Sequence, residues 1–478
     1  MQLVTTTPIA LILFSFALIL GPVRGMWCLT VTFPFGAAAA VNAAGAGSIA
    51  MYDLVALAVW LWLIASPISL EQILGVFRLG EPGLPLLLLL VWMAIGAIFL
   101  PRVLQDATEI FVTVRRTDGA ANVLIPLRPV GSNINQLLRM ILASSMFVAM
   151  AAIFARYGNH FRVRQGMIVA TAAHISLAVL NLASIAVGMP DLLDVVRTAN
   201  MAMLDNQSIL GLARISGGFP EASAFGFYTI GLYGYWLRDW IGENRSWFSG
   251  FFLLAILLLL LRSTSTSAYL GFFAVTALFL SWHFAGSLRR KRSFFVYYLI
   301  AVGVPLLIGL FVLAWNFVPQ VSGIVDRVLV NKLSSDSGSE RMSWNTQALV
   351  NFADSWGLGV GVGSVRASSW ILSCLGSLGL LGTGLYLWFV GAVLLKGRHR
   401  AAPSALTDCA AALQSGAFAT VLQACISKPF PNLDMPFFMM SGAATGLLVY
   451  AARVRASERV DVALQPTLRD VQTTLAKP

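Results

Sequence analysis

The sequence predicts an all-α, polytopic membrane protein, a helical bundle of about 12–13 spans. Its 478 residues are 58% hydrophobic and 11% charged, with a mean hydropathy of +0.79, whereas about a quarter of a soluble protein is charged. The apolar runs reach the ~20 residues that cross a bilayer. Strand-like alternation is absent, which excludes an outer-membrane barrel. A soluble enzyme, a disordered protein and a nucleic-acid-binding domain are excluded despite a net charge of +11.

The predicted spans follow the apolar runs. They lie near residues 7–22, 26–44, 50–66, 84–101, 135–155, 166–187, 219–237, 247–261, 264–284, 293–314, 369–395, 407–427 and 435–452. The run 26–44 is broken by Pro34 and Gly36, so it either crosses the membrane or re-enters on the same side. The first run follows MQLVTTTP, which lacks the basic stretch of a cleavable signal, so we expect a retained span.

Basic clusters between the spans predict which loops are cytoplasmic. Three clusters carry this signal: RRKR at 289–292, Lys396 with Arg398 and Arg400, and Arg453 with Arg455 and Arg459. Placing all three inside puts residues 102–134, 188–218, 315–368 and 428–434 on the opposite side. The chain then divides into membrane helices over 1–314, a large periplasmic loop over 315–368, C-terminal membrane helices over 369–453 and a cytoplasmic tail over 454–478.

The large loop contains a predicted short helix. Ser337 and Glu340 have the spacing of a capping box, in which the serine caps and the glutamate reaches back. Met342, Leu349 and Phe352 fall roughly on one helical stripe, which predicts a helix from about 338 to 352 near the membrane face. Arg341 would lie in its first turn.

A glycine-rich stretch, GLGVGVGSVR, follows at 357–366 and ends in Arg366. Backbone amides at such glycines can surround an anion, and a guanidinium adds charge-assisted hydrogen bonds to a phosphate. The alternative is a flexible hinge followed by an interfacial arginine. No GK[ST] sequence is present, so the stretch is not a nucleotide-binding P-loop.

Two more polar clusters lie at predicted span ends. Arg214 and Glu221 flank the entry to the span at 219, and Arg262 opens RSTSTS between two apolar runs. Glu221 would occupy the first turn of a helix, where a carboxylate is favoured, or else line a cavity at membrane level. The Ser and Thr residues are expected to bond across helices or back to the backbone, while Arg262 is a further candidate for an anion site.

Histidine and cysteine give no metal or triad signal. Cys28, Cys374, Cys409 and Cys425 lie in apolar segments without a CxxC pair, so neither a disulfide framework nor a structural metal is expected. The predicted non-cytoplasmic stretches contain no histidine, which argues against Ser/His/Asp catalysis and a zinc site there. His174, inside a span, is expected to hydrogen-bond to a neighbouring helix.

The order of these motifs resembles the O-antigen ligase and polymerase superfamily, bacterial inner-membrane glycosyltransferases of the GT-C type. The matching pieces are RISGGFPEASAFG at 214–226, LLRSTSTSAYLG at 260–271, SGSERMSWNTQAL at 337–349, GVGVGSVRASS at 359–369, LGSLGLLG at 375–382 and PFPNLDMPFF at 429–438. The resemblance covers residues 214–440 in detail and the remainder by topology.

The resemblance implies transfer of a glycan from undecaprenyl pyrophosphate to another glycan on the periplasmic face, without a cofactor or metal. The ligase branch, which joins O-antigen to lipid A core, looks to carry a histidine after the glycine-rich stretch. Here that region reads SVRASSWILSCLGSLG, which favours a polymerase of O-antigen or exopolysaccharide repeat units. A glycolipid transporter or flippase is a third alternative, but it requires mid-span charges, and these are rare here.

Within this resemblance, each polar residue has an expected role. Arg214, Arg341 and Arg366 are expected to bind the pyrophosphate, with Arg262 as a fourth candidate. Candidate general bases are Glu221 and Glu340, followed by Asp354, and candidate carbohydrate-contacting aromatics are Trp315, Trp344 and Trp356, which are alternatively interfacial anchors. Expected partners are the carrier-linked oligosaccharide and the lipid bilayer, with a chain-length regulator and a flippase as further candidates and no nucleic acid.

Overall fold

The computed structural model is mostly helical. It describes residues 2–43, 47–68, 70–116, 119–201, 203, 208–209, 212–242, 246–288, 336–397 and 404–475. Several sequence predictions fall outside these residues, namely the span 293–314, loop residues 315–335 with Trp315, the RRKR cluster at 289–292, Arg398 and Arg400.

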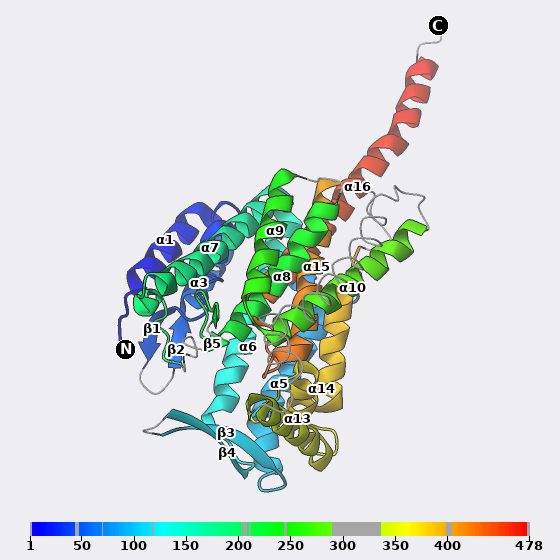
Figure 1. The fold of residues 1–478 in the computed structure, drawn as a ribbon. Coiled ribbons are helices and arrows are strands. Elements are labelled where there is room, and N and C mark those ends of the chain that lie inside the picture. Colours follow the sequence, from blue (N-terminus) through cyan, green and yellow to red (C-terminus); the bar gives the residue numbers. More distant parts are fainter. Residues whose placement is uncertain are drawn as a thin grey trace.

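The helices pack into one bundle (Figure 1). In chain order they are α1 (Thr7–Arg24), α2 (Met26–Thr30), α3 (Met51–Ala65), α4 (Leu70–Leu74), η1 (Gly75–Phe77), α5 (Gly83–Val103), α6 (Gly131–Tyr157), α7 (His160–Ala186), η2 (Pro190–Val195), α8 (Ala222–Ile241), α9 (Trp247–Arg262), α10 (Thr266–Leu288), α13 (Asp336–Asp354), α14 (Trp370–Leu395), α15 (Ala405–Ser427) and α16 (Asp434–Leu475). The strands form hairpins of β1 (Ala39–Ala43) with β2 (Gly47–Ala50), β3 (Glu109–Arg116) with β4 (Gly119–Pro126), and β5 (Ser208–Ile209) with β6 (Leu212–Ala213).

Within the described residues, seven helices are long and apolar enough to cross a membrane. They are Thr7–Arg24, Gly83–Val103, Gly131–Tyr157, His160–Ala186, Trp370–Leu395, Ala405–Ser427 and Asp434–Glu458, and shorter apolar helices cover Met51–Ala65, Trp247–Arg262 and Thr266–Ser281. Each overlaps a span expected from the sequence. These helices are compatible with a multi-pass membrane protein.

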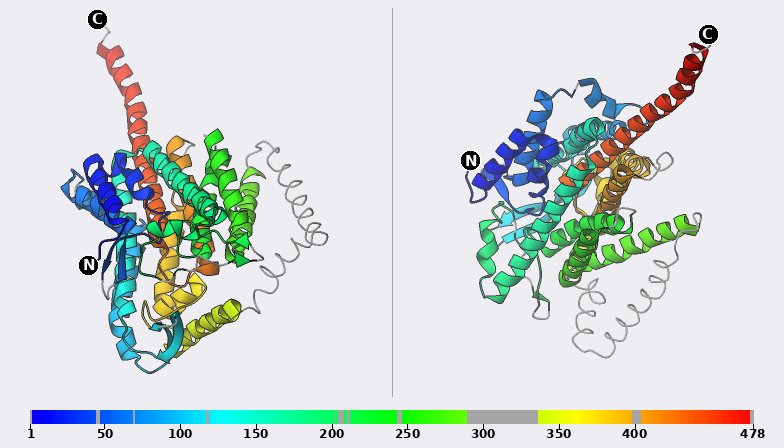
Figure 2. Two further views of the ribbon diagram at one scale, coloured as in Figure 1. Left: turned by 60° about the vertical axis from the view of Figure 1, so that its left-hand side comes forward. Right: turned by 90° about the horizontal axis from the view of Figure 1, so that it is seen from above.

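The bundle has two different ends (Figures 1 and 2). The hairpin β3–β4 and helix α13 lie at one end, which we call the loop end. Helix α16 projects far beyond the other end, which we call the tail end. At the tail end, the ring of Tyr450 lies directly against Gly158, and the Arg453 guanidinium donates a hydrogen bond to the carbonyl of Ala155 (3.2 Å).

The predicted span 26–44 is not a continuous helix. Helix α2 ends at Thr30, turns follow, and β1 begins at Ala39. The physical reason is the pair Pro34 and Gly36, since proline lacks an amide donor and Gly36 has the Phe219 ring so close that an added Cβ would lie 2.5 Å from it. The Ala37 amide instead donates to the carbonyl of Gly218 (2.8 Å). The segment thus joins α1 to the loop that precedes α8.

The expectation that strand-like alternation is absent is wrong at 109–126. Strands β3 and β4 pair antiparallel from Glu109 opposite Pro126 to Arg116 opposite Gly119. The sequence signal was Asp118-Gly119 between two β-branched runs, which is typical of a hairpin. It was overlooked because these short runs adjoin much longer apolar segments.

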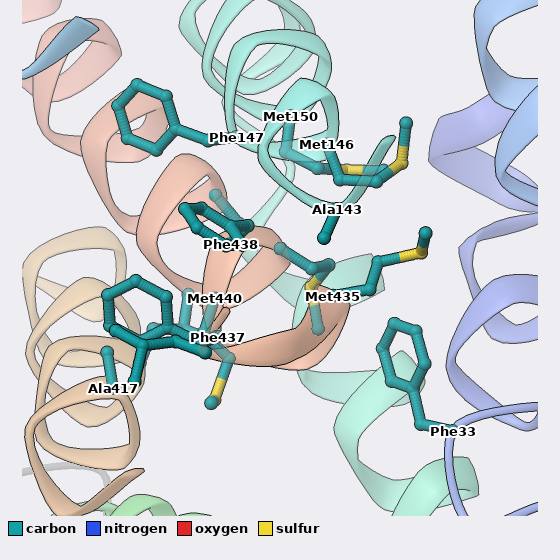
Figure 3. Close-up of a cluster of buried hydrophobic side chains, with 14 of the residues drawn as sticks. Phe33, Ala143, Met146, Phe147, Met150, Ala417, Met435, Phe437, Phe438 and Met440 are labelled. Carbon is teal, nitrogen blue, oxygen red and sulfur yellow. The ribbon is translucent and has the colours of Figure 1, made fainter. Parts of the chain in front are cut away.

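The centre of the core lies where α6 packs against α16 (Figure 3). Phe147 of α6 and Phe438 of α16 both contact Phe389 of α14, with ring centroids 5.1 and 6.0 Å apart. Glycines let the two backbones approach, because a Cβ on Gly442 would lie 2.4 Å from the Phe147 carbonyl oxygen. Small residues at such contacts are typical of helix packing in membranes. Helices α6 and α16 are therefore closely packed along the centre of the bundle.

Candidate functional site

The glycine-rich stretch at 357–366, which we call the bracket, is tightly packed between helices. Gly359, Gly361 and Gly363 have φ angles of +80°, +91° and +84°, a region that strongly favours glycine. A Cβ on them would lie 2.5 Å from the Gly379 nitrogen, 2.6 Å from the Gly96 carbonyl oxygen and 2.4 Å from the Ser132 carbonyl oxygen, respectively. The glycines are therefore required by close contact with α14, α5 and α6.

The bracket's central amides are used inside the protein. Val360 and Gly361 donate to the carbonyls of Gly376 and Ser377, each at 2.9 Å, and the Gly359 amide donates to the Ser355 hydroxyl at 2.9 Å. Amides that are already bonded cannot also surround a phosphate. The amides of residues 359–361 therefore do not form the predicted anion-binding nest.

Helix α14 breaks where the bracket meets it. Gly379 has φ +66° and ψ −166°, and an added Cβ would lie 2.2 Å from the Gly357 carbonyl oxygen. The Leu378 carbonyl beside the break accepts a hydrogen bond from the Trp92 indole (2.8 Å), and the Leu380 amide donates to Gly357 (2.8 Å). A break whose polar groups are bonded in this way is a fixed feature.

Arg366 leaves this bracket between two anchored neighbours. Val365 and Ala367 are buried in a small apolar cluster with Ala348 of α13 and Ile110 of β3. The Ala367 amide donates to the carbonyl of Pro429 (3.3 Å). Because the backbone is held on both sides, the half-buried Arg366 side chain starts from a fixed position.

Arg214 is positioned by the segment that follows it. The amides of Ser216 and Gly217 both donate to the side-chain oxygen of Asn181, at 3.0 and 3.1 Å. The guanidinium of Arg197, which is 6% exposed, donates to the carbonyl of Gly217 at 2.7 and 2.9 Å. Sequence analysis missed Arg197 because nothing in its local sequence marks a buried cation.

Helix α13 carries Glu340 and Arg341, and the predicted helix at 338–352 is confirmed, with bounds Asp336–Asp354. The capping-box assignment is wrong. The helix begins before Ser337. The Glu340 carboxylate instead accepts a hydrogen bond from the side-chain amide of Asn122 in β4 (3.0 Å). The β3–β4 hairpin thus holds α13, with a second attachment where Asn351 donates to the carbonyl of Glu109 (2.6 Å).

The buried face of α13 also differs from the predicted stripe. Met342 and Leu349 are 57% and 47% exposed, whereas Trp344, Ala348 and Asn351 are buried. The guanidinium carbon of Arg366 lies 4.4 Å from the centroid of the Trp344 ring, a cation–π contact. Trp344 therefore packs against Arg366 at the loop end, and among the described residues its indole N–H has no hydrogen-bond partner.

Five predicted charged residues from three segments interact electrostatically, namely Arg214, Glu221, Glu340, Arg341 and Arg366. Burial lowers the pKa of the Arg214 guanidinium, Glu221 raises it, and Arg341 lowers it further. Burial also lowers the pKa of Arg366, while the carboxylates of Glu340 and Glu221 raise it. A guanidinium stays protonated in proteins, so the site concentrates positive charge in a partly desolvated place.

The carboxylate of Glu221 raises the pKa of both arginines. It is the residue directly before α8 and not in its first turn, and its carboxylate accepts a hydrogen bond from the Ser223 hydroxyl. Its backbone carbonyl accepts from Phe225 (3.1 Å). The side chain is half-buried.

Arg262 lies at the edge of this group. It is the last residue of α9, and it interacts electrostatically with Tyr269 of α10, which also interacts with Arg214. The following Ser263, Thr264 and Ser265 are buried in the turn between α9 and α10. Of the two predicted modes, bonding back to the backbone is found for Ser263, which donates to the carbonyl of Leu260 (2.8 Å).

Lys428 is a further cation near the site that the sequence analysis did not select. Its ammonium lies 4.6 Å from the centroid of the Phe227 ring of α8 and pairs with the Asp434 carboxylate. Pro429, the next residue, accepts the Ala367 amide described above. Lys428 therefore lies between Arg366 and the start of α8. The signal in the sequence was a lysine directly after an apolar span.

Other candidates are not brought into this group. Asp354 is exposed at the end of α13, and Trp356 is 92% exposed. His174 hydrogen-bonds to Thr229 (2.9 Å) and stacks on Phe225, which confirms the expected helix contact. In the part of the chain that the structure describes, no three His, Cys, Asp or Glu side chains are grouped so that they could hold a metal ion.

Comparison with known proteins adds no assignment: no protein-family model matches this chain, and no curated protein matches it.

Proposed function

We propose that the protein is a glycosyltransferase of a bacterial inner membrane that polymerises a surface polysaccharide, O-antigen or exopolysaccharide. In this proposal it transfers the growing glycan from undecaprenyl pyrophosphate to a lipid-linked repeat unit, and the loop end faces the periplasm. The observation that carries the proposal is that Arg366 packs on Trp344 of α13, the helix that carries Glu340 and Arg341, and that Arg214 and Arg366 are both electrostatically coupled to Glu221.

The charge of this group supports binding of a pyrophosphate. Three guanidinium groups stand against two carboxylates, and Arg366 is additionally held against Trp344. Cations that are positioned before the reaction stabilise charge that develops on a leaving group, and removal of one such contact costs about 10²–10³ in rate.

The proposed reaction is a single displacement. The hydroxyl oxygen of the acceptor sugar bonds to the anomeric carbon of the donor, and the bond from that carbon to the pyrophosphate oxygen breaks. The electron pair leaves with undecaprenyl pyrophosphate, which the arginines stabilise, and the hydroxyl proton goes to Glu221. Glu340 is the less favoured base, because its side chain is exposed whereas that of Glu221 is half-buried.

The orientation is supported by the basic residues at the tail end. Arg453 and Arg455 of α16 lie there, and so does Lys396 after α14, which pairs with Glu81. An excess of Lys and Arg marks cytoplasmic ends. The opposite loop end, with the arginine group, would then face a carrier-linked saccharide in the periplasm.

Gel analysis of surface glycan from a strain that lacks this protein tests the proposal. A polymerase predicts that the ladder collapses to a single repeat unit and returns when the wild-type chain is supplied. Long polymer that accumulates on its lipid carrier would instead show a ligase. A ladder that is unchanged would refute both, and a loss of lipid-linked units from the outer leaflet would favour a flippase.

A further inference from the structure

A cavity at the tail end lies outside the group of charged residues described above. It has a volume of about 480 Å³ and lies between the ends of α1, α3, α6 and α7. This volume falls within the ~300–1,000 Å³ typical of small-molecule sites. Its lining includes Arg24 and Arg162, and the described lining residues contain no acidic side chain. The cavity therefore favours an anion.

The shape of the cavity is built into the fold. Gly21 has φ +70° inside α1, and an added Cβ would lie 2.6 Å from the Trp62 indole nitrogen. This break, followed by Pro22, turns the last residues of α1 away from the straight helix path. The ring of Trp62 packs edge-on against Tyr157, with centroids 6.4 Å apart. Two aromatic rings thus form one wall.

The two cations differ in how they are held. Arg162 donates from its guanidinium to the side-chain oxygen of Gln165 (2.7 Å), and its backbone amide donates to Asn159 (3.2 Å). The bond to Gln165 holds one Nη of the guanidinium. The planar guanidinium has further N–H donors, and their arrangement suits phosphate oxygens. Arg24 is exposed at the end of α1, so it can close over a ligand that enters from the surface.

The surroundings indicate what kind of anion enters. Ile19, Ile64 and Phe161, each next to this region in sequence, are 79%, 77% and 65% exposed. Ile19 and Phe161 belong to helices long enough to cross a membrane and Ile64 to a shorter apolar helix, so in a bilayer lipid chains would cover these side chains. A phosphate group in the cavity would therefore sit directly above acyl chains, with Trp62 and Tyr157 at the level typical of aromatic residues at a membrane surface.

We infer that this cavity binds the phosphate headgroup of an anionic phospholipid, whose acyl chains lie against the neighbouring apolar surface. Basic pockets between membrane helices are known to take such headgroups. A free phosphate ion has the same charge chemistry but no chains, so it would gain nothing from Ile19, Ile64 and Phe161. This site is independent of the proposed sugar transfer.

Native mass spectrometry of the purified full-length protein tests this inference. The probes are phosphatidylglycerol and diacylglycerol with identical chains, with inorganic phosphate as a competitor. We expect phosphatidylglycerol to bind about tenfold or more tightly than diacylglycerol, since two charge-assisted contacts are made only with the former. Inorganic phosphate at millimolar concentration should not displace it. Displacement would overturn the lipid assignment in favour of a free anion.

A matched pair of double variants separates the cavity from general surface charge. Arg24→Gln with Arg162→Gln should reduce the affinity for phosphatidylglycerol to that for diacylglycerol. Arg156→Gln with Arg453→Gln removes the same charge from exposed tail-end positions outside the cavity lining. This control pair should change the affinity for phosphatidylglycerol less than twofold. Equal loss in both pairs, or no loss in the first, would overturn the inference. Arg24→Gln alone, at an exposed position, gives the same test with the least risk to folding.

Discussion

Arg366 and Trp344 join two segments of the loop end, since the guanidinium carbon lies 4.4 Å from the indole centroid. Trp344 belongs to α13, and Arg366 to the loop that precedes α14. The contact orients a cation whose surroundings are already shaped by Glu221 and Glu340. In our account, this arginine and Arg214 bind the pyrophosphate that leaves during sugar transfer.

Replacing either arginine should stop chain extension without preventing assembly. Arg366→Ala and Arg214→Ala are expected to lower the rate of polymerisation about 10²-fold or more, measured by the glycan ladder in a deletion strain. Arg128→Ala removes an exposed cation next to α6 and should leave the ladder unchanged. If both site variants reach the membrane and give wild-type chain lengths, the assignment of these arginines is wrong.

The ring of Trp344 should matter more than its N–H group. Trp344→Phe keeps an aromatic face for Arg366, so activity should fall less than threefold, whereas Trp344→Ala should lower it roughly tenfold, within the ~0.5–2 kcal/mol of a cation–π contact. Trp356→Ala is the control, because this side chain is 92% exposed. Equal activity of the Phe and Ala variants would argue against the cation–π role.

The two glutamates should respond differently to amide replacement. Glu221→Gln removes the proposed base and should lower the rate about 10²–10⁴-fold. Glu340→Gln keeps an oxygen that accepts from Asn122, so the rate should change only a few-fold. Rates are compared with purified protein and a lipid-linked repeat unit. The opposite order would assign the base to Glu340.

Replacing a glycine of the bracket with alanine should lower the stability of the folded protein. Gly359→Ala places a Cβ 2.5 Å from the Gly379 nitrogen at φ +80°, and the backbone strain alone costs about 1–2 kcal/mol. Gly384→Ala, in α14 with no atom within 4 Å of the added Cβ, should be neutral or raise the Tm, because alanine is the better helix former. Thermal unfolding of the two purified variants in detergent gives the comparison. A Gly359→Ala protein with the wild-type Tm would contradict the bracket.

The sequence predicted the helices well because burial in a membrane demands long apolar runs. Where a run was interrupted, as at Pro34 and Gly36, its length alone no longer identified the structure. The short hairpin at 109–126 was missed since its eight-residue strands lie beside a 21-residue helix. The helix predicted at 338–352 is present as Asp336–Asp354, although neither the capping box nor the apolar stripe that predicted it is found.

Predictions of individual contacts succeeded less often, because they depend on distant partners. The glycine-rich stretch was predicted to surround an anion, but the amides of Val360 and Gly361 and the carbonyl of Gly357 bond to α14, which lies further along the chain. Glu340 bonds to Asn122, 218 residues earlier. Arg197 and Lys428 acquire their positions only in the folded bundle. In contrast, Arg214, Arg341 and Arg366 were selected from the sequence, and the fold brings them into one electrostatic group.

The most direct test of the central claim uses the purified protein in lipid nanodiscs with an undecaprenyl-pyrophosphate-linked repeat unit and no nucleotide sugar. Product length and released undecaprenyl pyrophosphate are measured together. Our account predicts glycans longer than one repeat, one carrier released for each bond formed, and loss of both in Arg366→Ala and Arg214→Ala. A wild-type protein that releases no carrier from its native lipid-linked unit, or arginine variants that release it at the wild-type rate, would contradict it.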